Sequence, residues 1–202
     1  MSGYNIIRLS DIVTELGEEK ALSILSDFSC PVNPDIENFL KSSAITLGKQ
    51  RVSVTYLIFT SFKKQDVLIG YFTLCNKTIV LHKSKLSNNL SKKINKFATY
   101  DMDRKGYVLS APLIAQIGKN FNNNYNSLIS GDELLKIAIE KVSEGQKILG
   151  GKIVYLECED IPFLIDFYSD NGFCEFDKRH LKTEEQCHLN TPYLVQMLKY
   201  LR

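Results

Sequence analysis

Strand-like and helix-like segments alternate along the second half of the chain, and few folds accommodate that order. Residues 107–117 (YVLSAPLIAQI) are strongly apolar, a polar loop follows, and residues 130–149 carry apolar side chains at helical spacing. Short apolar strands and another helix complete the series. Because helices that alternate with strands pack their apolar faces onto a sheet, the order predicts an α/β or α+β fold with six or seven strands.

The first half predicts a β-hairpin. Residues 52–60 and 67–74 are rich in β-branched and aromatic side chains, and a turn-prone stretch, 63–66, separates them. Residues 79–81 extend the second strand or form a short third one. The remaining expected elements are helices over 14–27, 35–47 and within 82–99, strands over 153–156 and 173–176, a helix capped by Asp160 that runs through Tyr168, and a strand or short helix over 193–201.

Composition places the chain among globular proteins. It has 202 residues, 44% hydrophobic and 24% charged, so we expect a single domain over residues 1–202. Twenty-five basic against twenty-three acidic residues give a net charge of +2, which does not mark a nucleic-acid binder as a whole but allows local patches. Five scattered cysteines without a C-x-x-C pair favour reduced thiols, and no apolar run is long enough for a membrane span. We therefore expect a cytoplasmic protein that does not enter a membrane.

Several well-known chemistries lack their motifs. The chain contains no G-x-x-x-x-G-K-[ST], G-x-G-x-x-G, G-x-S-x-G or H-E-x-x-H sequence. Its three histidines are unpaired by any metal-ligand spacing, and we expect no metal site. The strand–loop–helix junction over 114–135 is different, because backbone N–H groups and the dipole at a helix N-terminus suit an anion such as a pyrophosphate.

Motifs in the second half resemble those of the GNAT superfamily of N-acetyltransferases. Residues 167–173 (FYSDNGF) are similar to the F-Y-x-x-x-G-F signature near the end of that family. Residues 113–118 (LIAQIG) resemble its central strand, and residues 131–135 (GDELL) fall where its pyrophosphate-binding helix begins. The resemblance implies a GNAT-like mixed, mostly antiparallel sheet flanked by helices.

The first half resembles one branch of that family, which contains acetyltransferase toxins of toxin–antitoxin modules that acetylate aminoacyl-tRNA. In this branch a Cys-x-Asn segment precedes a Phe-Leu helix and a hairpin that ends in Gly-Tyr-Phe/Tyr-Thr-Leu. The corresponding residues here are 30–33 (CPVN), 38–40 (NFL) and 70–74 (GYFTL). The matches cover most of the chain in the right order.

The resemblance implies acetyl-CoA as co-substrate and assigns roles to individual residues. Tyr168 would be the general acid that protonates the leaving thiolate, which a phenolic hydroxyl can do as a donor. A backbone N–H near Ile117 or Gly118 would polarise the thioester carbonyl. The expected cofactor-binding residues are Gln116, Ile117, Gly118, Asn126, Ser130, Gly131 and Asp132.

The sequence departs from the family in two places. The family loop reads Gln/Arg-x-x-Gly-x-Gly/Ala, and residues 126–131 (NSLISG) keep only the last glycine. We expect residues at about 76–106 to form a lysine-rich helical insertion relative to the compact toxin-like form. Residues 157–177 carry seven acids and no base, whereas 82–99 carry five lysines and no acid. The acids could attract a cationic amine and the lysines could hold CoA phosphates or tRNA, or both are solvated faces.

Three functions remain open. The first is an acetyl-CoA-dependent N-acetyltransferase that moves the acetyl group to a primary amine by direct attack. The second is a toxin-like acetyltransferase that acts on aminoacyl-tRNA, and the third is a degenerate GNAT-like binding module without catalysis. The expected partners are acetyl-CoA and an amine acceptor, with tRNA and a homodimer left open.

Overall fold

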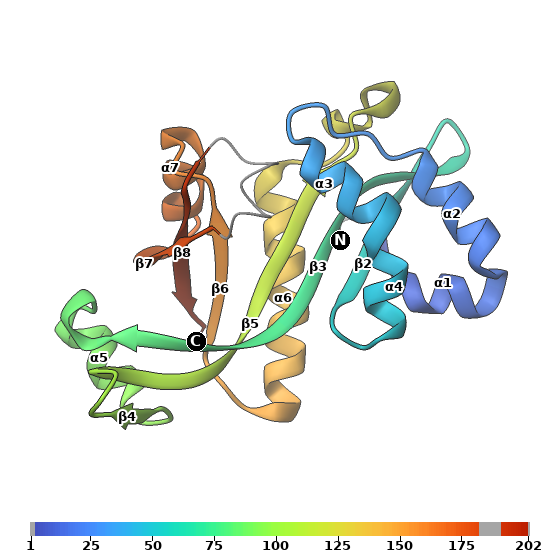
Figure 1. The fold of residues 1–202 in the computed structure, drawn as a ribbon. Coiled ribbons are helices and arrows are strands. Elements are labelled where there is room, and N and C mark those ends of the chain that lie inside the picture. Colours follow the sequence, from blue (N-terminus) through green and yellow to red (C-terminus); the bar gives the residue numbers. More distant parts are fainter. Residues whose placement is uncertain (1–2, 182–190, 202) are drawn as a thin grey trace. The chain divides into compact units, whose positions relative to one another are not determined.

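The computed structural model describes residues 3–181 and 191–201 and shows a mixed α/β fold (Figure 1). Eight strands hydrogen-bond in the order β1-β2-β3-β5-β6-β8-β7, with β4 added to β5. The helices are α1 (Leu9–Leu16), α2 (Glu18–Ser26), α3 (Pro34–Asn38), α4 (Ala44–Lys49), α5 (Asn88–Ile94), α6 (Gly131–Leu149) and α7 (Pro162–Asp170), and the strands are β1 (Tyr4–Arg8), β2 (Val54–Phe62), β3 (Gln65–His82), β4 (Thr99–Asp101), β5 (Gly106–Lys119), β6 (Ile153–Cys158), β7 (Cys174–His180) and β8 (Tyr193–Tyr200).

The predicted fold class is confirmed. The β1/β2, β2/β3, β4/β5, β6/β8 and β7/β8 pairs are all antiparallel, as expected for a mostly antiparallel sheet. The sheet has eight strands where we predicted six or seven, because β1 and β4 lie in segments that we assigned to no strand. None of the described helices is both long enough and apolar enough to cross a membrane.

Contacts divide the chain into two compact units, which are described separately below. Unit 1 comprises residues 1–75 and 114–141, and unit 2 comprises residues 76–113 and 142–202. The predicted insertion at about 76–106 belongs to unit 2 together with the C-terminal strands. A single domain over 1–202 with an insertion stays a prediction.

Unit 1 contains the predicted hairpin. β2 and β3 pair from Val54↔Leu74 to Phe62↔Gln65, and the two-residue turn between them, Lys63-Lys64, has φ values of 51° and 66°. A turn with two left-handed residues matches the twist of the flanking strands. The helix predicted over 14–27 is two helices, because Gly17 adopts a φ of 84° that ends α1 and starts α2 in a new direction.

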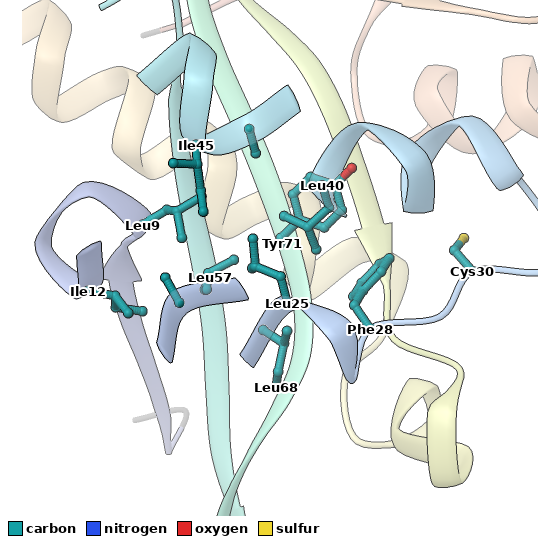
Figure 2. Close-up of a cluster of buried hydrophobic side chains, with 12 residues drawn as sticks. Leu9, Ile12, Leu25, Phe28, Cys30, Leu40, Ile45, Leu57, Leu68 and Tyr71 are labelled. Carbon is teal, nitrogen blue, oxygen red and sulfur yellow. The ribbon is translucent and has the colours of Figure 1, made fainter. Parts of the chain in front are cut away.

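The core of unit 1 lies between these helices and one face of the hairpin (Figure 2). Tyr71 on β3 is fully buried, and its ring meets Phe28 edge-to-face at a centroid distance of 5.1 Å. The Tyr71 hydroxyl donates to the carbonyl of Ile36 at 2.5 Å, which ties α3 to the sheet. The other buried members of the cluster are Leu9, Ile12, Ala21, Leu25, Cys30, Leu40, Ala44, Ile45, Leu57 and Leu68.

Unit 2 contains the antiparallel strands β6, β8 and β7 and a small lobe made by α5 and β4. Helix α5 begins where the Ser87 hydroxyl accepts from Leu90 N–H, and the side chain of Ile94 at its end is fully buried. Helix α7 ends at Asp170, and Gly172, with a φ of 81°, follows its C-cap Asn171. The predicted cap of α7 is wrong: the N-cap is Ile161, and the Asp160 carboxylate instead accepts from Lys178 and Tyr193.

Candidate active site

The residues predicted to bind the thioester lie near the end of β5 in unit 1, beside helix α3. Gln116 Nε2 donates to the Asp35 carboxylate at 3.3 Å. A β-carbon at Gly118 would lie 2.5 Å from Ile36 Cγ2, so α3 packs directly onto the strand at this residue. A β-carbon at Gly70 would in turn lie 3.0 Å from the Gly118 carbonyl. Packing against Ile36 therefore requires glycine at position 118, independently of any role in binding.

We expect Gly118→Ala to lower the free energy of unfolding by about 1–3 kcal/mol, because the added methyl must displace Ile36 in a packed contact. Gly145→Ala is the matched control. Nothing lies within 4 Å of a β-carbon built at Gly145, which is inside helix α6, so this variant should gain about 0.5–1 kcal/mol. Urea titration of both variants measures the difference. Equal stability of Gly118→Ala and the unmodified chain would contradict the close contact.

An asparagine just after β5 holds the start of the loop. Asn120 is fully buried, and its Nδ2 donates to the carbonyls of Leu68 at 2.8 Å and Asp27 at 3.1 Å. Its Oδ1 accepts from the N–H groups of Ser29 and Asn122, each at 3.0 Å. One side chain thus satisfies four backbone groups from three separate segments. We did not single out Asn120 from the sequence.

The rest of the loop is built from asparagines in unusual backbone conformations. Asn123 and Asn124 have φ values of 47° and 61°, a left-handed backbone that asparagine tolerates. Lys119 Nζ donates to the Asn126 carbonyl at 3.0 Å, which joins the end of β5 to the far side of the loop. A cation therefore lies beside a residue predicted to contact the cofactor.

Helix α6 begins with a capping box. Ser130 Oγ accepts from Glu133 N–H at 3.1 Å, and the Glu133 carboxylate accepts from Ser130 N–H at 2.9 Å. The hydrogen bond from Ser130 N–H is the main cause that lowers the pKa of Glu133. Two N–H groups of this helix start are therefore already used, one of them by a carboxylate. An incoming pyrophosphate would have to share this helix end with Glu133 or displace its side chain.

The predicted general acid, Tyr168, lies on α7 in unit 2. Its ring meets Phe167 and Phe173 edge-to-face, at centroid distances of 5.0 and 6.0 Å. Burial raises the pKa of the Tyr168 hydroxyl far above its usual value, and the neighbouring Cys158 adds to this effect. The hydroxyl therefore stays protonated at physiological pH, which a proton donor requires.

The Tyr168 hydroxyl has no hydrogen-bond partner among the described residues. The residue as a whole is buried, with 8% of its surface exposed. A protonated hydroxyl without a partner among the described residues can donate to a ligand atom that reaches it.

The acidic run is partly neutralised by cations that follow it in the sequence. Glu157 accepts from Arg179 Nε at 2.7 Å, and Asp160 accepts from Lys178 Nζ at 3.2 Å. Asp177 pairs with Lys85, so the two charge runs also meet each other. The interpretation of the two charge runs as separate solvated faces therefore does not hold for Asp177 and Lys85. No base for the acceptor amine emerges from these pairs.

Other features of the described residues support no further chemistry. Among residues 3–181 and 191–201, no group of three or more His, Cys, Asp and Glu side chains could hold a metal ion. A cavity of about 250 Å³ in unit 1 lies between α1, α4 and the start of β2. None of the predicted site residues lines it. Seven of these residues thus belong to the β5–α6 region of unit 1 and Tyr168 to unit 2, and their roles stay predictions.

Solved structures match nearly the whole chain, whereas no protein-family model and no curated protein matches its sequence. The crystal structure of a bacterial toxin is 18% identical, with a TM-score of 0.63, and the match covers 100% of this chain and 92% of that one. The toxin AtaT in complex with acetyl-methionyl-tRNAfMet is 14% identical, with a TM-score of 0.60 and coverages of 95% and 93%. A Tyr-to-Phe variant of AtaT bound to the C-terminus of the antitoxin AtaR and acetyl-CoA is 13% identical, with a TM-score of 0.55 and coverages of 96% and 92%.

These likenesses are remote in sequence and concern the fold. They extend over both units. The resemblance to GNAT-type acetyltransferase toxins is therefore confirmed at the level of structure. The chain shares the fold of the GNAT-type toxins of toxin–antitoxin modules.

Proposed function

We propose that the chain transfers the acetyl group of acetyl-CoA to the primary amine of an aminoacyl-tRNA. The observation that carries the proposal is Tyr168 on α7, whose hydroxyl has no hydrogen-bond partner among the described residues and whose pKa is raised by burial, so that it can serve as a donor. The likeness to AtaT, solved once with an acetylated methionyl-tRNA and once with acetyl-CoA, favours this acceptor over a small amine or a protein.

The reaction needs two proton movements. The acceptor amine must lose a proton before or during attack on the thioester carbonyl, and water or a base takes it up. A C–N bond forms, the C–S bond breaks, and the electron pair of that bond leaves with sulfur. In this proposal Tyr168 donates its proton, or a hydrogen bond, to the thiolate as it leaves. A backbone N–H at Ile117 or Gly118 stabilises the negative charge that develops on the carbonyl oxygen.

The residues at the start of α6 would hold the co-substrate's phosphates. Gly131 presents a helix start without a side chain, and Asn126, Ser130 and Asp132 surround it in the sequence. Lys119 adds a positive charge at the Asn126 carbonyl. The pantetheine arm would pair with the backbone near Gln116, as an extended peptide pairs with a strand edge. Because Glu133 already occupies part of the helix end, this chain should bind the phosphates less tightly than a consensus loop does.

The test offers labelled acetyl-CoA with a panel of aminoacyl-tRNAs, the same tRNAs uncharged, and free amino acids. We expect label on the α-amino group of charged tRNA only. Label on free amines but not on charged tRNA would contradict the acceptor and leave a general N-acetyltransferase. No label on any acceptor would contradict catalysis.

If no acceptor is labelled, thermal unfolding with acetyl-CoA shows whether the chain still binds the co-substrate. At a hundred times the dissociation constant, the ligand should stabilise the fold by about 2.7 kcal/mol. Stabilisation without turnover on any acceptor would point to a binding module that retains the cofactor. No stabilisation at millimolar acetyl-CoA would mean that the altered loop no longer binds it.

A further inference from the structure

The lobe formed by residues 83–105 in unit 2 holds most of the chain's excess positive charge. It contains seven basic residues and two acidic ones, a net charge of +5. The remainder of the chain has eighteen basic and twenty-one acidic residues, a net charge of −3. The overall charge of +2 therefore hides a strongly cationic lobe on an otherwise acidic chain. Such a separation of charge is typical of a surface that binds a polyanion.

Most of the lobe's cations are not used for internal ion pairs. Lys85 pairs with Asp177, and Arg104 lies 3.8 Å from Asp101. The other five form no ion pair with a described residue, and all five are exposed: Lys83, Lys92, Lys93, Lys96 and Lys105. Their charge is thus available to a partner.

Exposed aromatic rings lie among these lysines. Phe97 is 39% exposed and Tyr100 is 37% exposed. Lys83 Nζ lies over the Tyr100 ring at 6.0 Å, and Lys93 Nζ lies over the ring of Tyr200, which also contacts Phe97. Lysines interleaved with accessible aromatic faces are the chemistry with which proteins bind nucleic acids, through phosphates and stacked bases.

The lobe is anchored to the strands of unit 2 by its buried residues. Ser91 on α5 and the buried Tyr107 on β5 hydrogen-bond through their hydroxyls at 3.2 Å, and Tyr107 meets Tyr100 edge-to-face. A β-carbon at Gly106 would lie 2.9 Å from the Leu81 carbonyl, so the start of β5 packs closely onto the end of β3. Figure 1 shows α5 and β4 together in this lobe.

We propose that this basic-aromatic surface, made of Lys83, Lys92, Lys93, Lys96, Phe97 and Tyr100, binds RNA. The lysines contact backbone phosphates, and unstacked bases lie against Tyr100 and Phe97. The inference rests on the proposed function, because the RNA that it names is the tRNA that carries the acceptor amine. It adds that the acceptor is held by the lysine-rich lobe of unit 2, residues 83–105.

The test measures binding of uncharged tRNA, so that no chemistry is involved. Anisotropy titrations from about 50 to about 200 mM salt give the affinity and its salt slope. In the triple variant Lys92→Gln, Lys93→Gln, Lys96→Gln we expect the slope to fall by about 2–3, and the low-salt affinity to fall at least tenfold, because each lost phosphate contact removes about 0.7–0.9 from the slope. The matched control is Lys20→Gln, Lys136→Gln, Lys147→Gln, which removes the same charge from exposed positions elsewhere. The control should keep the wild-type affinity and slope.

A second pair of variants tests the stacking. Tyr100→Leu should weaken tRNA binding on the order of tenfold without changing the salt slope, since a lost stacked base is not a lost phosphate contact. Tyr100→Phe keeps the ring and should bind like the unmodified chain. Thermal unfolding of both variants shows whether the lobe remains folded.

Each result decides the proposal separately from the proposed function. Equal loss of tRNA binding in the triple variant and its control would overturn the proposal that this surface binds RNA. It would not contradict the acetylation of charged tRNA. Wild-type tRNA binding that depends on the lobe, without acetylation of charged tRNA, would support the surface and contradict the proposed acceptor. Binding of the lobe to phosphatidylserine vesicles and not to tRNA would also overturn the proposal, in favour of an anionic lipid.

Discussion

Replacement of Tyr168 by phenylalanine should lower the turnover of acetyl transfer by about 100-fold or more, the usual range for loss of a general acid. The ring and its contacts with Phe167 and Phe173 remain, so only the donor is removed. The dissociation constant of acetyl-CoA should not change. Since the lost hydroxyl has no partner among the described residues, the free energy of unfolding should stay the same or rise slightly.

Tyr107→Phe is the matched control for this experiment. Tyr107 is also a buried tyrosine of unit 2, but its hydroxyl is hydrogen-bonded to Ser91 Oγ. We expect this variant to lose about 1 kcal/mol of stability and to keep its turnover at saturating substrate. The two variants should therefore show opposite patterns, one catalytic and one structural. Similar turnover in both would remove Tyr168 from the mechanism.

The pH dependence gives an independent check on Tyr168. Burial raises the pKa of its hydroxyl, so the donor form persists throughout the physiological range. Turnover should rise as the acceptor amine loses its proton and should show no fall below about pH 10, where an unburied tyrosine would begin to ionise. A fall in turnover below about pH 10 that is absent from Tyr168→Phe would contradict this, because it would mean that the Tyr168 hydroxyl ionises as a solvated tyrosine does.

The parts of the fold that could be predicted from the sequence are those with local signals. The hairpin has two β-branched strands around a short turn, and α6 carries an apolar stripe that begins at a capping serine, Ser130. Strand β1 is only five residues long and merges into an amphipathic helix, so its alternation was too short to detect. The single glycine at 17 was enough to divide a predicted helix, because its left-handed φ reorients the chain.

The features that local patterns missed or misassigned depend on residues that are distant in the sequence. Asp160 is a good helix cap by residue type, but Lys178 and Tyr193 compete for its carboxylate in the folded chain. Lys85 likewise meets Asp177 across 92 residues. Local patterns cannot reveal such competition, because they do not show which other segments lie nearby. Asn120 is the strongest case of this kind, since its partners come from residues 27–29, 68 and 122.

Asn120→Ala should lower the free energy of unfolding by about 3 kcal/mol. The variant leaves the N–H groups of Ser29 and Asn122 and the carbonyl of Leu68 without this side-chain partner, and a buried polar group without a partner costs about 1–3 kcal/mol. The Asp27 carbonyl keeps one bond, from Asn122 Nδ2 at 3.1 Å. Water that enters the space would recover part of the loss, so the penalties do not simply add.

Asn122→Ala provides the control, because its side chain makes a single, exposed hydrogen bond to the same Asp27 carbonyl. We expect a loss below about 1 kcal/mol for this variant. Urea unfolding of both variants gives the comparison, and equal losses would contradict the central role of Asn120. Acetyl-CoA binding should weaken in Asn120→Ala even where the protein remains folded, because Asn120 fixes the loop that leads to Asn126 and Ser130.

Asn120→Asp tests the hydrogen-bond directions separately. An ionised aspartate keeps the acceptor for Ser29 and Asn122 but places a negative charge against the Leu68 and Asp27 carbonyls, where a donor is needed. Burial beside these carbonyls would raise the pKa of the new carboxyl in the folded state. A carboxyl whose folded pKa is raised stabilises the fold below its unfolded pKa, near 4, and loses that contribution as the pH rises through the folded pKa. The stability deficit of Asn120→Asp should therefore shrink on acidification, when the protonated oxygen can again donate. A deficit independent of pH would mean that the side chain does not donate to these two carbonyls.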